Sequence, residues 1–407
     1  MKISKCRVCL SSLIEKVGSL GNQYYTGVFP NKKNISIPQG NLSLVLCSKC
    51  KLLQLDRSFD MDLMYGLNYG YMSSLNPHMV SHLYLKSLRL KKIINIKKGD
   101  IILDIGSNDG TYLNNFNSSF ILIGIDPTIK KLKKYYRKDI ITYPFFFNKE
   151  LVGKSFKNKK AKIITTISMF YDLTDPIKFA QDIYEVLDDE GIWHLEQSYM
   201  PSMIKNISYD TICHEHIEYY SLFSIKYIFD QVGFKIIDLE FNDINGGSFA
   251  ITLAKKKSTF KEISKAVHWL LKKEDVFNYN SKKTHEEFFK KVKVHKLLLK
   301  KLLLNIKSEK KKIYGYGAST KGNVILQYCG IGEDILDCIV DANIDKHNKY
   351  TPGTKIKILH ESYHNMKKPD FMLVLPWHFK NFIIKKERRF TINGGKLIFP
   401  LPDIEII

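Results

Sequence analysis

Apolar and polar residues alternate in strand-like and helix-like runs, most regularly between about residues 61 and 256. Short apolar runs bounded by turn-forming residues predict buried strands. The expected strands are Ile101–Ile105, Ile121–Ile125, Lys162–Thr166, Gly191–Leu195, Lys235–Phe241 and Phe249–Ala254. Because helix-like runs separate these strands, the region predicts an α/β sheet.

The stretch from Thr259 to Lys312 has a different pattern. It contains no proline or glycine, and its apolar residues recur at helical spacing, which predicts one or two long helices. The following residues return to strand-like runs, beginning at Ile313 before a glycine-rich turn, and predict a second, smaller α/β unit. We therefore expect three domains, at residues 1–60, 61–256 and 257–407.

The composition narrows the partners and the location of the protein. Lysine and arginine outnumber aspartate and glutamate by 63 to 41, which gives a formal net charge of +22. Because the basic residues are scattered, we interpret them as a surface that favours an anionic substrate, not as a nucleic-acid site. The chain lacks an apolar run of about 18 residues and an N-terminal signal peptide, so we expect a cytoplasmic protein without a membrane partner. Its oligomeric state cannot be predicted from this pattern.

Four of the seven cysteines form two C-x-x-C pairs near the N-terminus, Cys6 with Cys9 and Cys47 with Cys50. Each pair can present two thiolates from one tight turn, and two such turns complete a tetrahedral site without an open position. In a cytosolic chain, paired cysteines are metal ligands more often than disulfides. We therefore expect a structural Zn²⁺ ion, with redox-active or merely buried cysteines as the alternative.

A glycine-rich turn follows the first predicted strand of the α/β region, with the sequence Asp104-Ile-Gly-Ser-Asn-Asp-Gly110. Gly106 and Gly110 allow the backbone to approach a ligand closely. The next predicted strand ends at Asp126, 20 residues after Gly106. An acidic residue at this place can accept hydrogen bonds from both hydroxyls of a ribose.

The charge of this turn distinguishes between two adenosine cofactors. A dinucleotide site uses G-x-G-x-x-G to bind pyrophosphate at a helix N-terminus. Asp104 and Asp109 would repel pyrophosphate, but they suit a ligand that carries a sulfonium and an ammonium group. The turn therefore favours S-adenosylmethionine over NAD, with a turn that binds no cofactor as the remaining alternative. The expected cofactor contacts are Asp104, Gly106, Asn108, Asp109, Gly110, Asp126, Ser168 and Met169.

Ser168 and Met169 begin the loop after Lys162–Thr166, which we expect to be the fourth strand of the sheet. In this kind of fold, that loop borders the transferred group and the substrate. An ordinary connection between a strand and a helix is the alternative.

The segment from Tyr209 to Tyr220 is dense in groups that transfer protons, and its centre is His214-Glu215-His216. In an extended segment, the two histidines would share a face. A histidine with a pKa of about 6.5 is a suitable general base at neutral pH, and a carboxylate can orient it. A metal site or a surface histidine cluster is the alternative.

Together these motifs resemble the three-domain nucleotide-sugar C-methyltransferases of bacterial deoxysugar pathways. The shared segments are the cysteine pairs, Tyr69-Gly-Tyr-Met-Ser-Ser74, Asp104-Ile-Gly-Ser-Asn-Asp-Gly110, His214-Glu-His216, Asn245-Gly-Gly-Ser248 and Tyr314-Gly-Tyr-Gly-Ala-Ser-Thr-Lys-Gly322. They occur in the family's order and span nearly the whole chain. The resemblance implies an α/β protein: a class I, Rossmann-like methyltransferase domain, a small N-terminal zinc-binding domain, and a C-terminal Rossmann-like α/β domain that binds a nucleotide-diphosphate sugar.

The resemblance also implies that a ring carbon beside a ketone loses a proton and that the enolate takes the methyl group. By resemblance, His216 is the base, His214 and Glu215 support it, and Tyr71 lies near the sugar. Tyr219 is a second candidate donor to the sugar oxygen. The expected substrate contacts are Ser73, Ser74, Asp172, Cys213, Asn245, Gly247, Ser319, Thr320 and Lys321.

The glycine-rich turn of the C-terminal unit suits the diphosphate of such a substrate. Backbone N–H groups from Ala318 to Thr320 and the ammonium group of Lys321 are the expected contacts. A purely structural turn between a strand and a helix is the alternative.

Two residues of the acceptor region depart from the family pattern. Cys213 stands where the best-known members have tyrosine, and Asp172 where they tend to have histidine. O-methylation of a sugar or another small acceptor therefore stays an alternative, because it needs a base near a hydroxyl but no enolate. A zinc-containing nucleic-acid-binding module is a third hypothesis, which the scattered basic residues disfavour.

Overall fold

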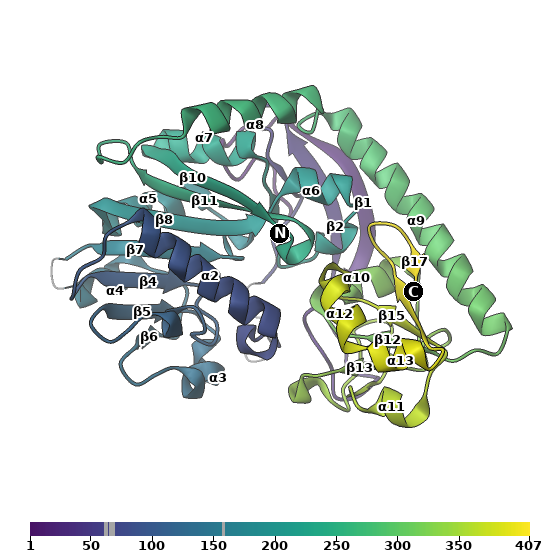
Figure 1. Cartoon of the computed structure of the whole chain (residues 1–407). Coiled ribbons are helices and arrows are strands. Elements are labelled where there is room, and N and C mark those ends of the chain that lie inside the picture. Colours follow the sequence, from purple (N-terminus) through teal and green to yellow (C-terminus); the bar gives the residue numbers. More distant parts are fainter. Residues whose placement is uncertain (61–63, 65–69, 157–158) are drawn as a thin grey trace.

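The computed structural model describes residues 1–60, 64, 70–156 and 159–407. It contains sheets of four, seven and six strands, and the long helix α9 (Lys282–Ser308) runs along one side of the molecule (Figure 1). Tyr69 of one shared segment, and residue 61, where we expect the second domain to begin, lie outside the described residues.

The seven-stranded sheet has the order β10-β11-β8-β7-β4-β5-β6. Its strands are β4 (Ile101–Ile105), β5 (Ile121–Ile125), β6 (Ile141–Tyr143), β7 (Ala161–Ile167), β8 (Leu187–Ser198), β10 (Phe234–Asn242) and β11 (Ser248–Lys255). Strands β4 to β8 are parallel, whereas β11 is antiparallel to both its neighbours. All six predicted strands are present, and β7 is the fourth, as expected. The chain returns to the middle of the sheet at β7, which creates a ligand-binding switch point beside β4.

Helices cover both faces of this sheet. One face carries α2 (Pro77–Ile93), and the other carries α5 (Pro176–Val186) and α7 (Leu222–Val232). Leu83 of α2 packs in one core with Ile102 of β4, whereas Ile183 of α5 packs in the other with Leu103. Because neighbouring strand residues point to opposite faces, β4 is apolar on both sides. The shorter helices are α3 (Ile129–Leu132), α4 (Lys149–Ser155) and α6 (Met200–Lys205).

The four-stranded N-terminal sheet is completed by a strand from the central region. Its antiparallel order is β1 (Ile14–Tyr24), β2 (Gln39–Cys47), β3 (Leu53–Leu55) and β9 (Glu218–Tyr219). Leu53 of β3 pairs with Tyr219 of β9. Because β9 begins just after His216, the His-Glu-His segment lies where the N-terminal sheet meets the central region.

Two helices, α8 (Ser264–Val276) and α9, lead to the C-terminal unit, so the predicted helical stretch is present. The six-stranded sheet has the order β14 (Ile358–His360), β13 (Cys338–Asp341), β12 (Ile313–Tyr316), β15 (Phe371–Val374), β16 (Lys396–Phe399) and β17 (Glu405–Ile406). All pairs are parallel except β16 with β17. The helices are α10 (Thr320–Cys329), α11 (Tyr363–Lys367), α12 (Lys380–Lys386) and α13 (Arg388–Ile392). Strand β12, its glycine-rich turn and α10 form a Rossmann-like unit.

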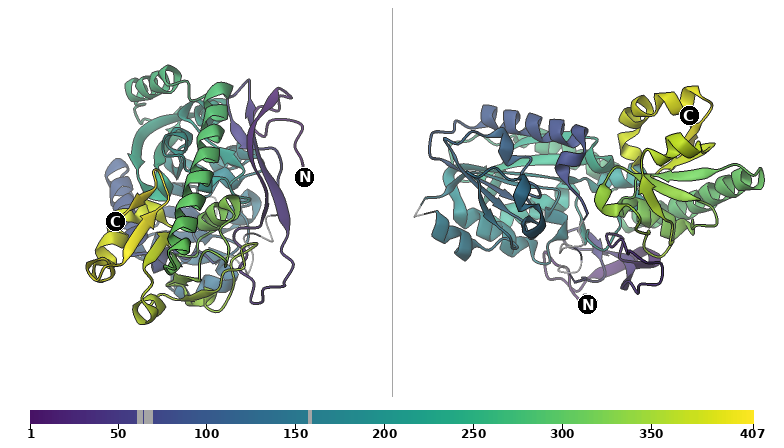
Figure 2. Two further views of the ribbon diagram at one scale, coloured as in Figure 1. Left: turned by 90° about the vertical axis from the view of Figure 1, so that its right-hand side faces the viewer. Right: turned by 90° about the horizontal axis from the view of Figure 1, so that it is seen from below.

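The three units share buried contacts. Leu44 of β2, Phe288 of α9 and Ile325 of α10 belong to one buried cluster, together with Tyr209 of the central region. Figure 2 shows the N-terminal strands beside the long helix and between the other two units. Within the described ranges, no helix has both the length and the apolar character needed to cross a membrane.

Candidate active site and zinc site

Two turns of the same shape bring the paired cysteines together. In each turn, the first cysteine's carbonyl accepts a hydrogen bond from the N–H group four residues later, at Leu10 or Lys51. These two residues have positive φ angles of 54° and 59°. The four Sγ atoms lie within 4.8 Å of one another and belong to Cys6, Cys9, Cys47 and Cys50.

This donor set fits Zn²⁺. Four thiolates at Zn–S distances of about 2.3 Å stand roughly 3.8 Å apart in a tetrahedron. The Sγ–Sγ distances are 3.5 Å between Cys6 and Cys50 and 3.4 Å between Cys9 and Cys47. Gln54 Nε2 donates to Cys6 Sγ at 3.2 Å and so orients that ligand. Four thiolates leave no open position, so the site is structural.

The glycine-rich turn after β4 places a buried carboxylate at the switch point. Gly106 and Gly110 have φ angles of 77° and 80°, which residues with side chains rarely adopt. Asp104 is buried, and its Oδ1 accepts from Thr165 Oγ1 at 2.6 Å. Burial raises the pKa of Asp104 to about 7. A cationic ligand would favour the ionised form, and S-adenosylmethionine carries such groups.

Asp126, at the end of β5, faces the same turn. Its Oδ2 accepts from the backbone N–H of Asn108 at 2.9 Å, and its Oδ1 from the N–H of Thr128 at 2.7 Å. Burial raises the pKa of Asp126. The hydroxyls of a ribose are donors that suit this carboxylate.

The segment from Tyr71 to Ser74 lies across the glycine-rich turn. The N–H of Ser73 donates to Asn108 Oδ1 at 3.0 Å, and the N–H of Ser74 donates to Asp109 Oδ2 at 2.9 Å. Asn108 Nδ2 donates to the carbonyl of Tyr71 at 3.2 Å, while the tyrosine itself is 43% exposed. The structure therefore joins two expected substrate residues to two expected cofactor residues.

The loop after β7 lies beside the glycine-rich turn. Met169 Cγ is 3.0 Å from the position that a Cβ would take at Gly106. Ser168 has a φ angle of 57°, and its Oγ accepts from Asn245 Nδ2 at 3.1 Å. Asp172 is buried at the end of the short helix η4 (Phe170–Asp172). This loop therefore connects the cofactor turn to the turn between β10 and β11.

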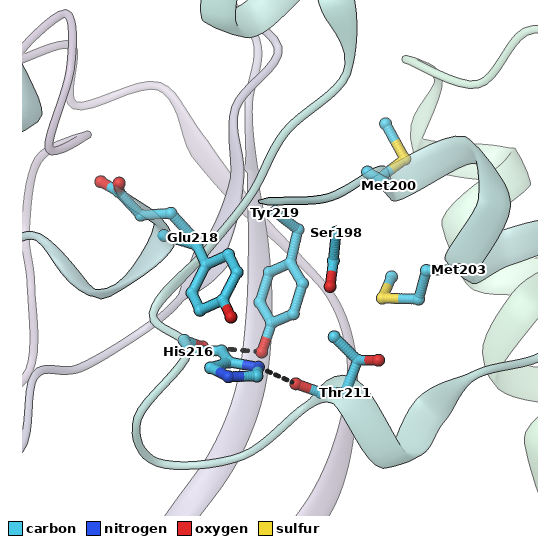
Figure 3. A pocket seen from close by; sticks show the side chains of 8 residues that line it. Ser198, Met200, Met203, Thr211, His216, Glu218 and Tyr219 are labelled. Carbon is cyan, nitrogen blue, oxygen red and sulfur yellow. Dashed lines mark hydrogen bonds between the residues drawn. The ribbon is translucent and has the colours of Figure 1, made fainter. Parts of the chain in front are cut away.

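His216 lines a small pocket (Figure 3). The pocket is lined by Tyr171, Ser198, Met200, Met203, Thr211, His216, Glu218 and Tyr219. His216 Nδ1 lies 3.0 Å from the carbonyl oxygen of Thr211. Because a carbonyl only accepts, Nδ1 carries the proton and Nε2 keeps its lone pair. Burial lowers the pKa of His216 to about 3, and the charge of Lys321 acts in the same direction.

His214 contacts the N-terminal unit instead. Its ring packs against Tyr25 and Phe59, with centroid distances of 4.8 and 4.7 Å. Burial lowers its pKa to about 4. The expectation that His214 and His216 share a face is wrong. The chain bends at residues 213–215, so its side chains do not alternate as they do in a strand.

The other predicted groups surround His216 in different ways. Glu215 Oε2 accepts from Thr26 Oγ1 at 3.3 Å, and burial raises the pKa of Glu215. Cys213 is buried and interacts with that carboxyl group. Tyr219 Oη donates to the carbonyl oxygen of His216 at 2.8 Å. The hydroxyl group that we expected at the substrate thus donates to the backbone of His216.

The first turn of α10 reaches the same junction. Thr320 Oγ1 lies 3.7 Å, and Glu215 Oε1 2.6 Å, from the Cβ position of Gly27. Lys321 Nζ donates to the carbonyl oxygen of Asn245 at 2.8 Å. Residues from all three units therefore meet around the His-Glu-His segment.

The glycine-rich turn before α10 already uses some of its polar groups. Ser319 Oγ caps α10 by accepting from the N–H of Gly322 at 2.9 Å. The N–H of Ala318 donates to Asp341 Oδ2 at 2.7 Å, so a carboxylate engages one of the three N–H groups expected to meet a diphosphate. Gly247 has a φ angle of 122° in the turn between β10 and β11.

Sequence reasoning missed three groups of this junction. Trp377 Nε1 donates to Asp210 Oδ2 at 2.9 Å, and Thr26 contacts Glu215 as described above. Asp210 lies within the proton-transferring segment, so its acidic side chain was a usable signal. Trp377 and Thr26 lie far from that segment in the chain, and only the packing brings them to it.

Three family models match the chain, one after another. They are described as "Putative zinc binding domain" at residues 6–65, "Methyltransferase domain" at residues 80–239 and "C-methyltransferase C-terminal domain" at residues 243–402. The first model contains the four cysteines, the second contains the cofactor turn and the His-Glu-His segment, and the third contains Lys321.

Individual proteins show similarity over different lengths. The C-methyltransferase NovU of Streptomyces niveus is 27% identical over 411 residues, which are 100% of this chain and 97% of that protein. The PH0226 protein of Pyrococcus horikoshii is 13% identical, with a TM-score of 0.35 over 46% of this chain and 95% of its own. The plantazolicin methyltransferase BpumL, solved with a triazolic desmethylPZN analog and SAH, is 14% identical, with a TM-score of 0.34 over 44% of this chain and 84% of its own.

The sheet order, the acidic glycine-rich turn and the methyltransferase model identify a class I domain that uses S-adenosylmethionine. The four thiolates and the zinc-domain model identify Zn²⁺ as the second cofactor. The three models follow the order of the three structural units, and NovU aligns along the full length. The chain therefore belongs to the family of S-adenosylmethionine-dependent C-methyltransferases that combine a zinc-binding N-terminal domain, a methyltransferase domain and a C-methyltransferase C-terminal domain.

Proposed function

We propose that the methyl acceptor is a carbon beside a ketone in a nucleotide-linked deoxysugar, and that His216 removes the proton from this carbon. The observation that carries the proposal is the 3.0 Å contact between His216 Nδ1 and the carbonyl oxygen of Thr211. It holds the imidazole in the tautomer whose Nε2 is basic, which a general base requires.

Burial makes the free imidazole of His216 a weak base, so proton removal depends on how the developing charge is stabilised. With a pKa of about 3, the free imidazole is neutral at neutral pH but weakly basic. The negative charge that develops on an enolate would favour the imidazolium and raise this pKa. Because a weak base can remove a poorly acidic carbon-bound proton only when the enolate oxygen is stabilised, the proposed reaction needs a donor at the ketone oxygen.

S-adenosylmethionine, bound at the turn after β4, supplies an electrophilic methyl group. In the proposed reaction, the carbon-bound proton moves to His216 Nε2, and the electron pair of the C–H bond is delocalised onto the ketone oxygen. The nucleophilic carbon then forms a bond to the methyl group, while the electron pair of the methyl–sulfur bond returns to sulfur. His216 finally releases its proton to solvent.

We propose that the diphosphate of the substrate lies near the N-terminus of α10. The positive end of a helix attracts anions, and the net charge of +22 favours an anionic ligand. Thr320 lies beside Gly27, whose Cβ position is also close to Glu215. A diphosphate bound there would place its sugar close to the base.

The base assignment is tested with His216→Asn, because asparagine keeps a polar side chain but cannot accept the proton at neutral pH. We expect this variant to lose methyl transfer. We also expect it to lose cofactor-independent exchange of the carbon-bound proton into deuterated water, measured by NMR on a nucleotide-linked ketosugar. Its affinity for S-adenosylmethionine should not change.

The matched control is His268→Asn, because His268 is exposed on α8. We expect the control to keep both activities. Full turnover by His216→Asn would remove His216 as the base. A methyl ether formed by the parent enzyme without proton exchange would contradict the enolate step.

A further inference from the structure

The ammonium group of Lys321 lies at the junction of the C-terminal unit and the acceptor site. The residue belongs to the first turn of α10, which packs against the short helix η5 (Tyr209–Thr211). Thr211, at the end of η5, provides the carbonyl that holds His216 Nδ1. The helix that carries Lys321 therefore contacts the element that positions the base.

Lys321 is also connected to the loop after β7. Its Nζ donates to the carbonyl of Asn245, whose Nδ2 donates to Ser168 Oγ. Asn245 and Ser168 both have positive φ angles, 58° and 57°. Left-handed backbone in residues other than glycine costs free energy and is concentrated at functional sites. Through the hydrogen bonds of Asn245 and Ser168, Lys321 is connected to the loop that borders the cofactor turn.

The charge of Lys321 acts on the acceptor site. The other charged and titratable groups around His216, Cys213 and Lys321 are Asp172, Asp210, Glu215, Glu218, Tyr171, Tyr219 and His378. Burial lowers the pKa of Lys321, which the charges of Asp210 and Cys213 oppose. Trp377 holds Asp210 by a hydrogen bond of 2.9 Å. The ammonium group is thus kept in a partly buried site, where its charge is weakly screened.

We propose that Lys321 donates to the ketone oxygen of the substrate and stabilises the negative charge that develops there. This proposal rests on the proposed enolate chemistry. An ammonium group has three N–H donors. Among the described residues, the carbonyl of Asn245 is its one hydrogen-bond acceptor, so two donors are available to a ligand.

The other groups near the base are less suited to this role. Tyr219 Oη already donates to the carbonyl oxygen of His216. Cys213, which replaces a tyrosine of the family pattern, offers only a weak S–H donor. A cation opposite the oxygen also resolves the weakness of the base, because it lowers the pKa of the carbon-bound proton that His216 must remove.

No redox change or additional reactant is needed. When the C–H bond breaks, the proton goes to His216 Nε2 and the negative charge goes to the oxygen that faces Lys321 Nζ. When the new carbon–carbon bond forms, the electron pair returns from the oxygen and restores the ketone. Lys321 keeps all its protons throughout.

The test compares Lys321→Met, Lys321→Gln and Lys321→Arg with the parent enzyme on a nucleotide-linked ketosugar. Removal of one donor to a developing oxyanion lowers kcat about 10²–10³-fold. We expect Lys321→Met and Lys321→Gln to lower both kcat and cofactor-independent proton exchange by about this factor, with little change in KM. Lys321→Arg, which keeps the cation, should restore part of both rates.

The pH profile provides a second readout that a merely structural role would not move. Because the positive charge lowers the pKa of His216, its removal should raise that pKa and move the acid limb of kcat/KM to higher pH. Lys321→Arg should keep the parental limb. Lys301→Met, at an exposed position of α9, is the matched control and should change neither rate.

Calorimetric binding of S-adenosylmethionine shows whether each variant is folded. If Lys321→Met does not fold, the rates of Lys321→Gln and Lys321→Arg test the proposal instead. A raised KM with unchanged kcat and exchange would overturn the proposal and assign Lys321 to the diphosphate. A parent enzyme that methylates carbon without proton exchange would overturn the enolate chemistry itself, and the role of Lys321 with it.

Discussion

The carboxylate of Asp126 both holds the backbone of the glycine-rich turn and lies where the cofactor is expected to bind. Its Oδ2 holds the N–H of Asn108 in the glycine-rich turn, and its Oδ1 holds Thr128. The same residue directly follows β5, where a ribose would lie. One residue thus positions the turn and provides the expected acceptor for the cofactor.

Asp126→Ala should weaken S-adenosylmethionine binding at least about tenfold, because a hydrogen bond to a charged group is worth about 1.5–3 kcal/mol. Titration calorimetry measures the affinity. Thr128→Val is the control, since it removes a hydroxyl that donates to Asp126 but keeps the carboxylate. Unchanged affinity in Asp126→Ala, or tight NAD binding by the parent chain, would contradict the assignment.

Gly27 allows the N-terminal unit to approach Glu215. A Cβ at Gly27 would lie 2.6 Å from Glu215 Oε1, so Gly27→Ala must displace this carboxyl group. We expect kcat to fall by about ten- to a hundredfold, because small misplacements in an active site are costly. Gly153→Ala, on α4, should keep the parental kcat, because its Cβ position faces open space among the described residues outside its own helix. Parental kcat in Gly27→Ala would separate Glu215 from the reaction.

At the scale of elements, β3 connects the zinc site to the His-Glu-His segment. It follows the second cysteine turn, and it pairs with β9, which begins two residues after His216. Gln54 of β3 also donates to Cys6 Sγ. The metal therefore holds the strand that anchors the end of the His-Glu-His segment.

The purified protein should contain about one Zn²⁺ ion, and Cys50→Ser should lose it together with stability, because metal binding is coupled to folding. Metal analysis and thermal unfolding measure the two effects. We also expect turnover to fall, since β3 loses its support. Cys338 lies in the C-terminal sheet, so the control variant Cys338→Ala should have the same zinc content as the parent protein. A zinc-free preparation with full stability and activity would refute this prediction.

At the scale of the whole molecule, the region around the His-Glu-His segment is a junction of three units that are far apart in the chain. Asn323 of α10 donates to the carbonyl oxygen of Thr26 at 2.7 Å, and Thr26 Oγ1 donates to Glu215. The N-terminal and C-terminal units thereby contact each other, and the N-terminal unit also contacts the His-Glu-His segment. Their relative position determines which groups surround His216.

Asn323→Ala should lower the free energy of unfolding by about 1–3 kcal/mol, because it leaves the buried carbonyl of Thr26 without its donor. Denaturant unfolding measures this change. Asn305→Ala, at an exposed position of α9, should stay within about 0.5 kcal/mol of the parent. An equal stability of the two variants would show that this contact does not hold the units together.

Local patterns were sufficient to predict the strands, the helical stretch before the C-terminal unit, the cysteine cluster and the glycine-rich turn that suits the cofactor. Each of these depends on neighbouring residues: a strand on its apolar run, a metal turn on two cysteines three positions apart, and the cofactor turn on glycines beside acidic residues. The domain boundaries, the roles of the site residues and the cytoplasmic location stay predictions.

Only the tertiary structure decided how the acceptor site is assembled. The bend at residues 213–215 directs His214 and His216 to different neighbours, although their spacing alone predicts a common face. Lys321 reaches Asn245, which lies 76 positions away in the chain, and Trp377 reaches Asp210 across 167 positions. Such contacts have no local signature. They arise because the three units bury one apolar cluster, and the packing of that cluster determines which polar groups meet at its edge.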